Sequence, residues 1–278
     1  MKQRTVIEAG DNGLGYWKDL WAYRGLFRFL AWRDLLVRYK QTVIGVAWAV
    51  IRPLLTIVVF SFFAELMDME TFALPAVLVV TAATLPMQLF TSALNEASNS
   101  LISNSGLITK VFFPRLIIPL STIIVCLVDF AITLVILIGL MFYYNVVPDS
   151  NIIYLPLFLL LLLMASLGAG VFLSAVNVKY RDFRYIIPFI VQVALYVSPI
   201  AFKTERILAS ERIPDFLKWL YSFNPMVAVI DGFRWSLFGE QFKIDQTSIF
   251  ISICVTVFLV VAGTWYFRKV EKNFADII

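Results

Sequence analysis

The sequence predicts an all-α integral membrane protein with six transmembrane helices, and three observations lead to that prediction. Of the 278 residues, 60% are hydrophobic and 15% are charged, whereas soluble domains average about 45–50% and about 25%. Six apolar stretches approach or exceed the roughly 20 residues that a bilayer requires. No polar stretch is long enough to form its own core. We therefore expect an N-terminal segment, 1–41, and a single transmembrane domain, 42–278.

The first predicted element is an amphipathic helix over residues 16–40. One side is apolar and rich in aromatic residues, and the other carries basic residues that recur at a four-residue spacing. This mixture is typical of a helix at the membrane surface, with its basic side toward the headgroups. A short soluble helix packed against the bundle is the alternative. The basic residues that would contact the headgroups are Arg24, Arg28, Arg33, Arg38 and Lys40.

Six spans follow this helix. Their predicted ranges are 42–64, 73–98, 117–143, 152–176, 185–202 and 247–267. The first span contains Arg52 near its middle, next to Pro53. A charge at that depth is costly and usually faces water or the interior of a bundle. Equally, the helix could begin lower or break at Pro53, which would let Arg52 reach the membrane surface.

The distribution of charge predicts the orientation of the chain. Six spans place both termini on one side, and most of the 23 Lys and Arg residues fall on that side. The two short loops on the other side, near Glu65–Glu70 and Asn145–Asn151, contain no basic residue. By the positive-inside rule, both termini are therefore expected in the cytoplasm.

The cytoplasmic loop after the second span contains a short helix-forming stretch. Asn104 or Ser105 can cap a helix that continues to Phe113, and Pro114 ends it. Apolar side chains on such a loop indicate a docking surface for another protein, although an ordinary turn on the membrane surface is the alternative. The candidate docking residues are Gly106, Leu107, Ile108, Thr109, Lys110, Val111 and Phe112.

Two further regions combine aromatic residues with polar sequence. One is the cytoplasmic turn at 177–188, and the other is the outer region at 203–246. Within the outer region, 214–221 and 226–238 have helical apolar spacing, and Asn224–Pro225 separates them. We expect two short helices there that dip into the outer membrane interface.

Several chemistries have no support in the sequence. It contains no histidine, no GxxxxGK[ST] phosphate loop, no GxSxG elbow and no paired carboxylates. We therefore expect no metal site, no nucleotide site in this chain and no nucleic-acid partner. Glu96 and Asp129 are isolated acids, each suited to one interior hydrogen bond or to a proton relay. If the protein moves a substrate uphill, the energy comes from a gradient or from a partner.

Five blocks of sequence, in order along the chain, carry a family resemblance. They are RYKQTVIGVAWAVIRPLL (38–55), SGLITKVFFPRLIIPLS (105–121), NVKYRDFRYIIPFIVQ (177–192), YVSPIAF (196–202) and YSFNPMVAVIDGFRW (221–235). Together they resemble the membrane subunit of ABC exporters for lipid-linked polysaccharides, the O-antigen, capsule and teichoic acid permease family. Arg52 departs from the pattern, which usually has a neutral residue before the proline.

The resemblance implies a homodimer with two copies of a separate ABC ATP-binding subunit, which would bind ATP and Mg²⁺, so this chain would hold no cofactor. It implies export of a polyprenyl-diphosphate-linked polysaccharide across the bacterial inner membrane, through a channel at the dimer centre. The 105–113 stretch would be the coupling helix, and the basic residues of 16–40 would handle the lipid diphosphate or attract anionic lipids. The implied inner gate is Tyr180, Arg181, Asp182, Phe183 and Tyr185, and the implied outer mouth is Phe216, Trp219, Tyr221 and Phe223.

Two alternatives belong to other classes. A membrane-embedded glycosyl- or acyltransferase would need a histidine or a cluster of acids, which the sequence lacks. A gradient-driven permease would need paired membrane acids and repeated halves, and no repeat is visible.

Overall fold

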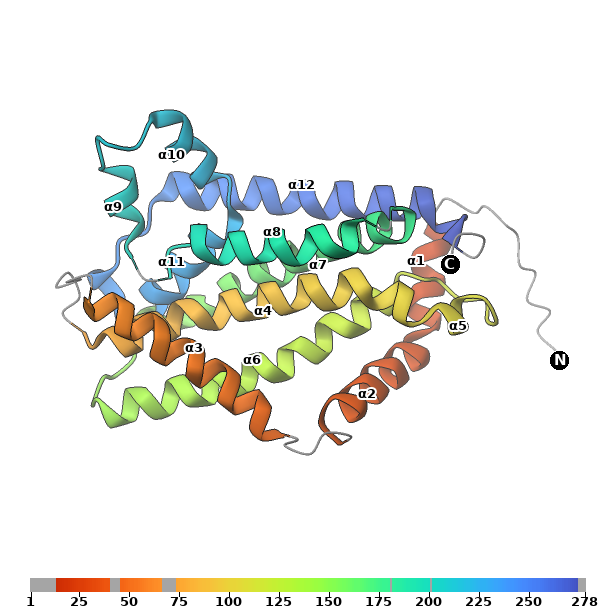
Figure 1. The fold of residues 1–278 in the computed structure, drawn as a ribbon, viewed down its shortest axis with the longest axis horizontal. Coiled ribbons are helices and arrows are strands. Elements are labelled where there is room, and N and C mark those ends of the chain that lie inside the picture. Colours follow the sequence, from red (N-terminus) through yellow and green to blue (C-terminus); the bar gives the residue numbers. More distant parts are fainter. Residues whose placement is uncertain (1–13, 41–45, 67–73, 181, 201, 275–278) are drawn as a thin grey trace.

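The computed structural model describes residues 14–40, 46–66, 74–180, 182–200 and 202–274. Within these ranges the chain is helical and contains no strand. Most of the long helices run roughly along the long axis of the molecule (Figure 1). The fold class is therefore the predicted one, an all-α membrane protein.

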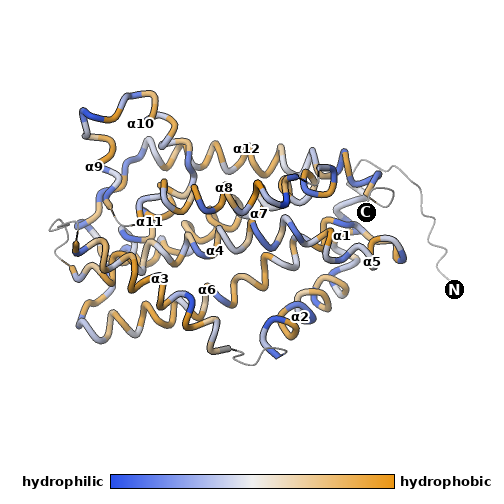
Figure 2. The backbone as a smooth tube through the Cα atoms, viewed as in Figure 1, coloured by the Kyte–Doolittle hydropathy of each residue, from blue (hydrophilic) through white to orange (hydrophobic). Residues whose placement is uncertain are grey.

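Among the residues that the structure describes, five helices are long and apolar enough to cross a membrane. They are α3 (Val46–Leu66), α4 (Ala76–Ser103), α6 (Ile117–Tyr143), α7 (Leu155–Lys179) and α12 (Gln246–Glu271). They correspond to predicted spans one, two, three, four and six. Figure 2 shows that apolar residues predominate along them.

The fifth predicted span, 185–202, is the exception. The helix α8 (Phe183–Val197) has 15 residues, fewer than the roughly 20 that a straight crossing requires. It ends where Ser198 turns to an extended backbone. Pro199 follows, and a proline disfavours the helical conformation of the residue before it. The apolar run up to 202 is thus interrupted.

The helix α4 forms the centre of the core. Side chains on all its faces are buried, from Leu78 to Leu101, and it packs against α3, α6, α7, α8 and the inner helix α11 (Pro225–Phe238). The helices α7 and α12 approach each other most closely. A Cβ atom added at Gly168 would lie 2.6 Å from the backbone carbon of Leu259. Glycine therefore lets these two helices meet backbone to backbone.

The position of α11 differs from the sequence prediction. Its apolar residues surround the helix, from Met226 to Ile230, and they are fully buried among α4, α7 and α12. A helix that is apolar all round belongs in a core. Only α9 (Thr204–Leu208) and α10 (Asp215–Ser222) project from the bundle at this end (Figure 1). We call it the α10 end.

The opposite end carries α1 (Leu14–Ala22), α2 (Arg24–Lys40) and α5 (Ser105–Ile108), and we call it the α5 end (Figure 1). The predicted 16–40 helix is divided at Tyr23, not at the more permissive Gly25. Leu30 is buried in a second core cluster with residues of α6 and α12. The opposite side of α1–α2 exposes aromatic rings, which are Trp17, Trp21, Phe29 and Trp32. This exposed stripe fits a helix pair at the membrane surface.

Two short 3₁₀ helices complete the described chain. The first, η1 (Ser150–Tyr154), leads into α7, and the second, η2 (Gly239–Gln241), follows α11. Asp149 caps η1 by accepting a hydrogen bond from the Asn151 N–H at 3.0 Å.

Candidate functional site

The predicted docking stretch is shorter as a helix than expected. The helix α5 contains four residues, and the chain then turns through Thr109 to Pro114. Gly106, Thr109 and Lys110 are exposed, while Leu107 is half-buried.

Ile108 requires a correction. Its side chain is 3% exposed and lies in the core cluster with Leu101 and Phe113, so it cannot serve as a surface anchor. The exposed apolar pair is Val111 and Phe112, with 49% and 64% of their surfaces accessible. Any docking contact made by this stretch would depend on that pair.

A hydrogen-bonded cluster fixes the end of this stretch to the frame. The Arg115 N–H donates to Glu271 Oε1 at 2.8 Å, and the Arg115 guanidinium donates to the Glu271 carbonyl oxygen. The Tyr16 hydroxyl donates to Glu271 Oε2 at 3.0 Å. Burial raises the pKa of Tyr16, and the nearby Glu271 charge raises it further. Three parts of the chain far apart in sequence thus meet at one carboxylate.

The basic residues of α2 divide into two groups. Arg24, Arg28 and Lys40 are exposed. Arg33 donates to Asp34 at 2.7 Å and to Asn104 at 2.6 Å, which attaches α2 to the end of α4. An exposed cation can contact a headgroup, whereas a paired one contributes mainly to holding the helix in place.

Arg38 belongs to the paired group. Its guanidinium lies 3.1 Å from Asp129 Oδ2 and 3.4 Å from Glu96 Oε1. The Tyr39 hydroxyl donates to the other oxygen of Asp129. Burial raises the pKa of Tyr39, and its hydrogen bond to Asp129 raises it further. The two isolated acids of the sequence are therefore partners of α2.

A pocket of about 600 Å³ lies among α2, α3, α4, α6 and α8. Its lining is mostly polar near α4, where Gln88, Ser92 and Asn95 line it, and Gln192 of α8 lines it as well. Gln88 lies near the midpoint of α4, so the pocket sits halfway along the bundle. We call this the central pocket.

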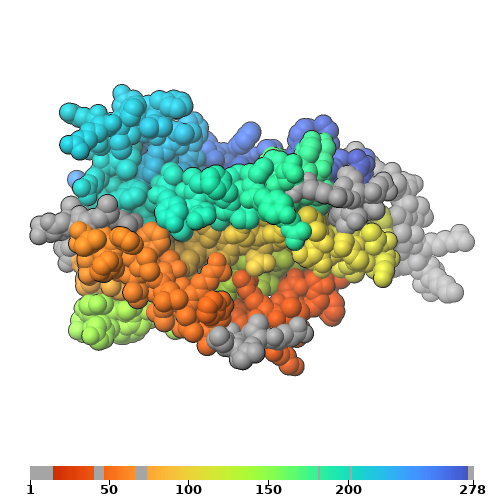
Figure 3. Space-filling view, viewed as in Figure 1, coloured from red at the N-terminus to blue at the C-terminus, as the bar shows by residue number. Residues whose placement is uncertain are grey.

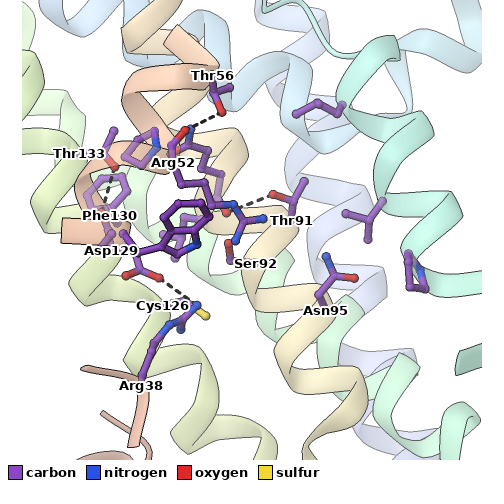
Figure 4. A pocket seen from close by; sticks show the side chains of 18 of the residues that line it. Arg38, Arg52, Thr56, Thr91, Ser92, Asn95, Cys126, Asp129, Phe130 and Thr133 are labelled. Carbon is purple, nitrogen blue, oxygen red and sulfur yellow. Dashed lines mark hydrogen bonds and ion pairs between the residues drawn. The ribbon is translucent and has the colours of Figure 1, made fainter. Parts of the chain in front are cut away.

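Arg52 of α3 is the notable member of its lining. Figure 4 shows the side chain extending into the pocket, toward the helix that carries Thr91 and Ser92. The helix α3 continues through Pro53 and begins partway along the bundle, not at the α5 end (Figure 1). Because α3 continues through Pro53, the break that one of the two alternatives invoked is absent. Arg52 is exposed and lines this polar space, and its depth within a membrane stays a prediction.

The guanidinium of Arg52 makes no ion pair and no hydrogen bond with any residue that the structure describes. Among the described residues that line the pocket, Asp129 is the only acid, and Arg38 and Tyr39 already engage it. Asn95 Oδ1 is buried and has no hydrogen-bond donor among the described residues. The Asn95 oxygen is inaccessible to solvent, so the uncommitted group that the pocket offers to a ligand is the Arg52 cation.

A second hollow of about 450 Å³ lies nearer the α5 end. Arg33, Glu96, Asn99 and Asn104 line it, and Arg38 lines both hollows. The Arg38–Asp129 pair therefore stands between the two spaces.

The open side of the central pocket lies between α3 and α8. In the space-filling view, α4 is visible at the bottom of the hollow between these two helices (Figure 3). Both helices expose large apolar side chains. On α3 these include Trp48, Leu55, Val58 and Phe62, and on α8 they include Tyr185, Phe189 and Tyr196.

The predicted inner-gate residues lie where α7 ends and α8 begins, toward the α5 end (Figure 1). Tyr180, Asp182 and Tyr185 are exposed, and Phe183 is half-buried with its ring 6.2 Å from that of Tyr180. Arg181 lies outside the described residues.

The predicted outer-mouth residues lie on and beside α10. Phe216 and Trp219 are exposed, and the rings of Trp219 and Phe223 are 5.1 Å apart. Tyr221 is buried, and its hydroxyl lies 3.4 Å from Thr204 Oγ1. Tyr221 therefore supports the helix and does not form part of an open surface, which corrects its assignment.

Sequence reasoning missed Arg234 of α11. Its side chain is fully buried and donates to the Ile200 carbonyl at 2.6 Å and to the Phe202 carbonyl at 3.1 Å. A longer bond of 3.4 Å reaches the Val79 carbonyl of α4, and Asp231 lies 4.0 Å away. A single arginine within an apolar helical run was the available signal.

Comparison with known proteins gives consistent matches over most of the chain. A family model described as ABC-2 type transporter matches residues 25–238. The chain is 27% identical over 249 residues to the O-antigen export system permease protein RfbA of Klebsiella pneumoniae, which covers 88% of this chain and 92% of that protein. A Myxococcus xanthus protein of the same name is 24% identical over 262 residues, covering 94% and 98%. The capsule polysaccharide export inner-membrane protein CtrC of Neisseria meningitidis is 24% identical over 240 residues, covering 83% and 85%.

Proposed function

Because this chain belongs to the ABC-2 type transporter family, we propose that it is the membrane subunit of an ATP-driven exporter for a lipid-linked polysaccharide. The observation that carries the proposal is the nearly full-length match to permeases named for O-antigen and capsule export. The five helices of spanning length fit a transport role. ATP and Mg²⁺ would be bound by a separate ABC subunit.

The α5 end is the proposed cytoplasmic side, with both termini there. The distribution of basic residues supports this orientation. The exposed Val111 and Phe112 would then face the ATP-binding subunit, surrounded by the polar rim of Thr109 and Lys110. Apolar anchors within a polar rim are the usual arrangement of a contact that carries binding energy.

The cluster around Glu271 supports a role for this stretch in transmitting force. Arg115, one residue after Pro114, is bonded to the end of α12 and, through Glu271, to Tyr16 of α1. Because the docking surface is attached to α1 and α12 in this way, a displacement of the surface would also move these two helices.

A homodimer would cover the apolar sides of α3 and α8 and enclose the hollow between them. The central pocket would then open to a channel between two copies. Aromatic rings allow the faces of sugars to pass without deep binding minima. Such rings lie near both proposed openings, at Tyr180, Phe183 and Tyr185 on the inner side and at Phe216, Trp219 and Phe223 on the outer side.

The exposed Arg24, Arg28 and Lys40 would handle the lipid diphosphate at the inner surface. Arginine forms forked, charge-assisted hydrogen bonds with phosphate oxygens. Arg33 and Arg38 would instead keep α2 attached to α4 and α6, since their side chains are already paired.

Copurification with the ATP-binding subunit tests the proposal. Val111→Asp and Phe112→Asp should lower retention of that subunit about a hundredfold, since an unpaired charge buried in a contact costs roughly 3–5 kcal/mol. Polymer export should fall in parallel. Lys110→Ala is the mild control, since a rim charge contributes little.

Ile108→Asp serves as a second control of a different kind. Because Ile108 is buried, this change should lower the amount of folded protein and not act on docking alone. Normal retention of the ATP-binding subunit and normal export in both Val111→Asp and Phe112→Asp would show that the partner does not dock here.

A further inference from the structure

The central pocket carries an inference that rests on the proposed function and makes its substrate more specific. We propose that the pocket is a transit site for an oxyanion carried by the exported glycan, with Arg52 as its cation. The oxyanion is a phosphate or a carboxylate attached to sugar, and the hydrogen-bonding groups around Arg52 contact the sugar hydroxyls.

The charge of the lining is the first argument. The lining residues that are charged at neutral pH are Arg38, Arg52 and Asp129, so its formal charge is two positive and one negative, or +1. Arg38 and Asp129 neutralise each other at 3.1 Å. The uncompensated charge therefore belongs to Arg52. Its guanidinium stays protonated in proteins, so the pocket cannot become neutral by losing a proton.

The position of Arg52 is the second argument. Arg52 is an exposed residue on a helix long and apolar enough to span a membrane, and charged residues within such helices normally pair or mark a substrate path. Arg52 pairs with no residue that the structure describes, whereas Arg38, which lines the same space, has two acids. The forked geometry of guanidinium matches the two oxygens of a carboxylate or phosphate.

The remaining polar groups are the third argument, because they indicate that the anion is attached to a sugar. Gln88 and Gln192 can both donate and accept. Trp48 lines the pocket beside Arg52 and offers an aromatic face for sugar C–H groups.

Two sources could provide this chemistry, and they differ in where the charge lies. One is the diphosphate that joins the polymer to its lipid, and the other is an acidic sugar or phosphodiester within the repeat. Binding by a single arginine and a few amides would be weak, as conduction requires, since a deep well would stop the polymer.

Binding of three probes tests the proposal and separates the sources. The complete transporter, with its ATP-binding subunit, would be reconstituted in lipid nanodiscs and titrated by thermophoresis with farnesyl diphosphate, tetragalacturonate and neutral maltotetraose. We expect at least one acidic probe to bind about tenfold or more tightly than maltotetraose. A preference limited to farnesyl diphosphate would identify the diphosphate of the lipid linkage as the bound oxyanion. A preference limited to tetragalacturonate would identify an acidic group within the sugar repeat.

Variants at Arg52 test whether this residue is responsible for the preference for acidic probes. Arg52→Gln should lower the preference for acidic probes about tenfold, leaving for farnesyl diphosphate only the part that Arg24, Arg28 and Lys40 contribute. Arg52→Lys should keep more of the preference, because lysine retains the charge without the fork. Arg212→Gln is the matched control. Arg212 is exposed near α10, so this variant removes the same charge at a site outside the pocket. Its preference should equal that of the wild type.

The proposal would be overturned if the wild type showed no preference for either acidic probe, or if Arg52→Gln kept the wild-type preference. Export of polymer by cells that carry only the wild-type chain tests the proposed function separately. Failure of the wild-type chain to restore export would refute the proposed function, whatever the probes show. Restored export with no acidic preference would refute only the transit site.

Discussion

Arg234 and Arg52 both lie within apolar helical runs, yet their surroundings differ in kind. Arg234 is fully buried, and its donors reach the carbonyls of Ile200, Phe202 and Val79. Arg52 faces an open pocket and is bound by no described side chain. A satisfied buried charge fixes one arrangement of the fold, whereas an unsatisfied one remains available to a ligand. The type of residue alone does not distinguish the two roles.

The helices that carry these arginines differ in the same way. The helix α11 is enclosed by α4, α7 and α12, while α3 contacts mainly α4 and leaves its outer side exposed. Nearly all residues of α11 are buried, whereas only 22% of the most apolar stretch of α3 is buried. The α11 region is thus a finished core. The α3–α8 region presents a wall that the proposed second copy would complete.

The largest expected effect on stability comes from replacing Arg234, the arginine of the enclosed α11 region. Arg234→Met keeps much of the side-chain volume but leaves Asp231 and three carbonyls without their cation. We expect the free energy of unfolding to fall by roughly 3–5 kcal/mol, the usual cost of leaving one partner of a buried pair alone. Thermal unfolding of the purified protein in detergent measures it.

Arg212→Met provides the control for that measurement, because the same change at an exposed site should shift the transition very little. An unchanged transition in Arg234→Met would mean that its three hydrogen bonds do not hold α11 to the end of α8.

A smaller effect is expected where α7 and α12 touch. Gly168→Ala places a methyl group 2.6 Å from the backbone of Leu259, so the helices must separate. Overpacking of this kind costs about 1–3 kcal/mol. Gly139→Ala in α6 has nothing within 4 Å of the new methyl group, and alanine favours the helix by up to about 1 kcal/mol. Gly168→Ala should lower the melting temperature and Gly139→Ala should raise it slightly. Equal shifts in the two variants would contradict the close approach of α7 and α12.

The sequence was sufficient to predict five of the six spans, because length and apolar composition are local properties. The third span, 117–143, matches α6 at both ends. The interruption after α8 followed from Ser198–Pro199, which was visible in the sequence, but the 15-residue length of the helix was not predicted. The basic pattern of α2 was equally visible.

The partners of these residues could not be predicted, because they depend on how distant segments pack. Glu271 meets Arg115 across 156 positions of the chain, and no local pattern connects them. The inward direction of Ile108 and the burial of α11 have the same origin. An apolar side chain on a short helix can face either a partner or the core, and only the packing decides between them.

The smallest expected effect sharpens the contrast between two arginines of the same pocket. Arg38→Gln leaves Asp129 and Glu96 without their cation, and it should lower the free energy of unfolding by about 1–2 kcal/mol, since both acids keep some contact with solvent. Arg52→Gln leaves no described residue without a partner, so the change should stay within about 0.5 kcal/mol. Thermal unfolding of the two variants side by side measures the difference. A loss in Arg52→Gln as large as that in Arg38→Gln would mean that Arg52 stabilises the fold, and the contrast between a structural and an available cation would then fail.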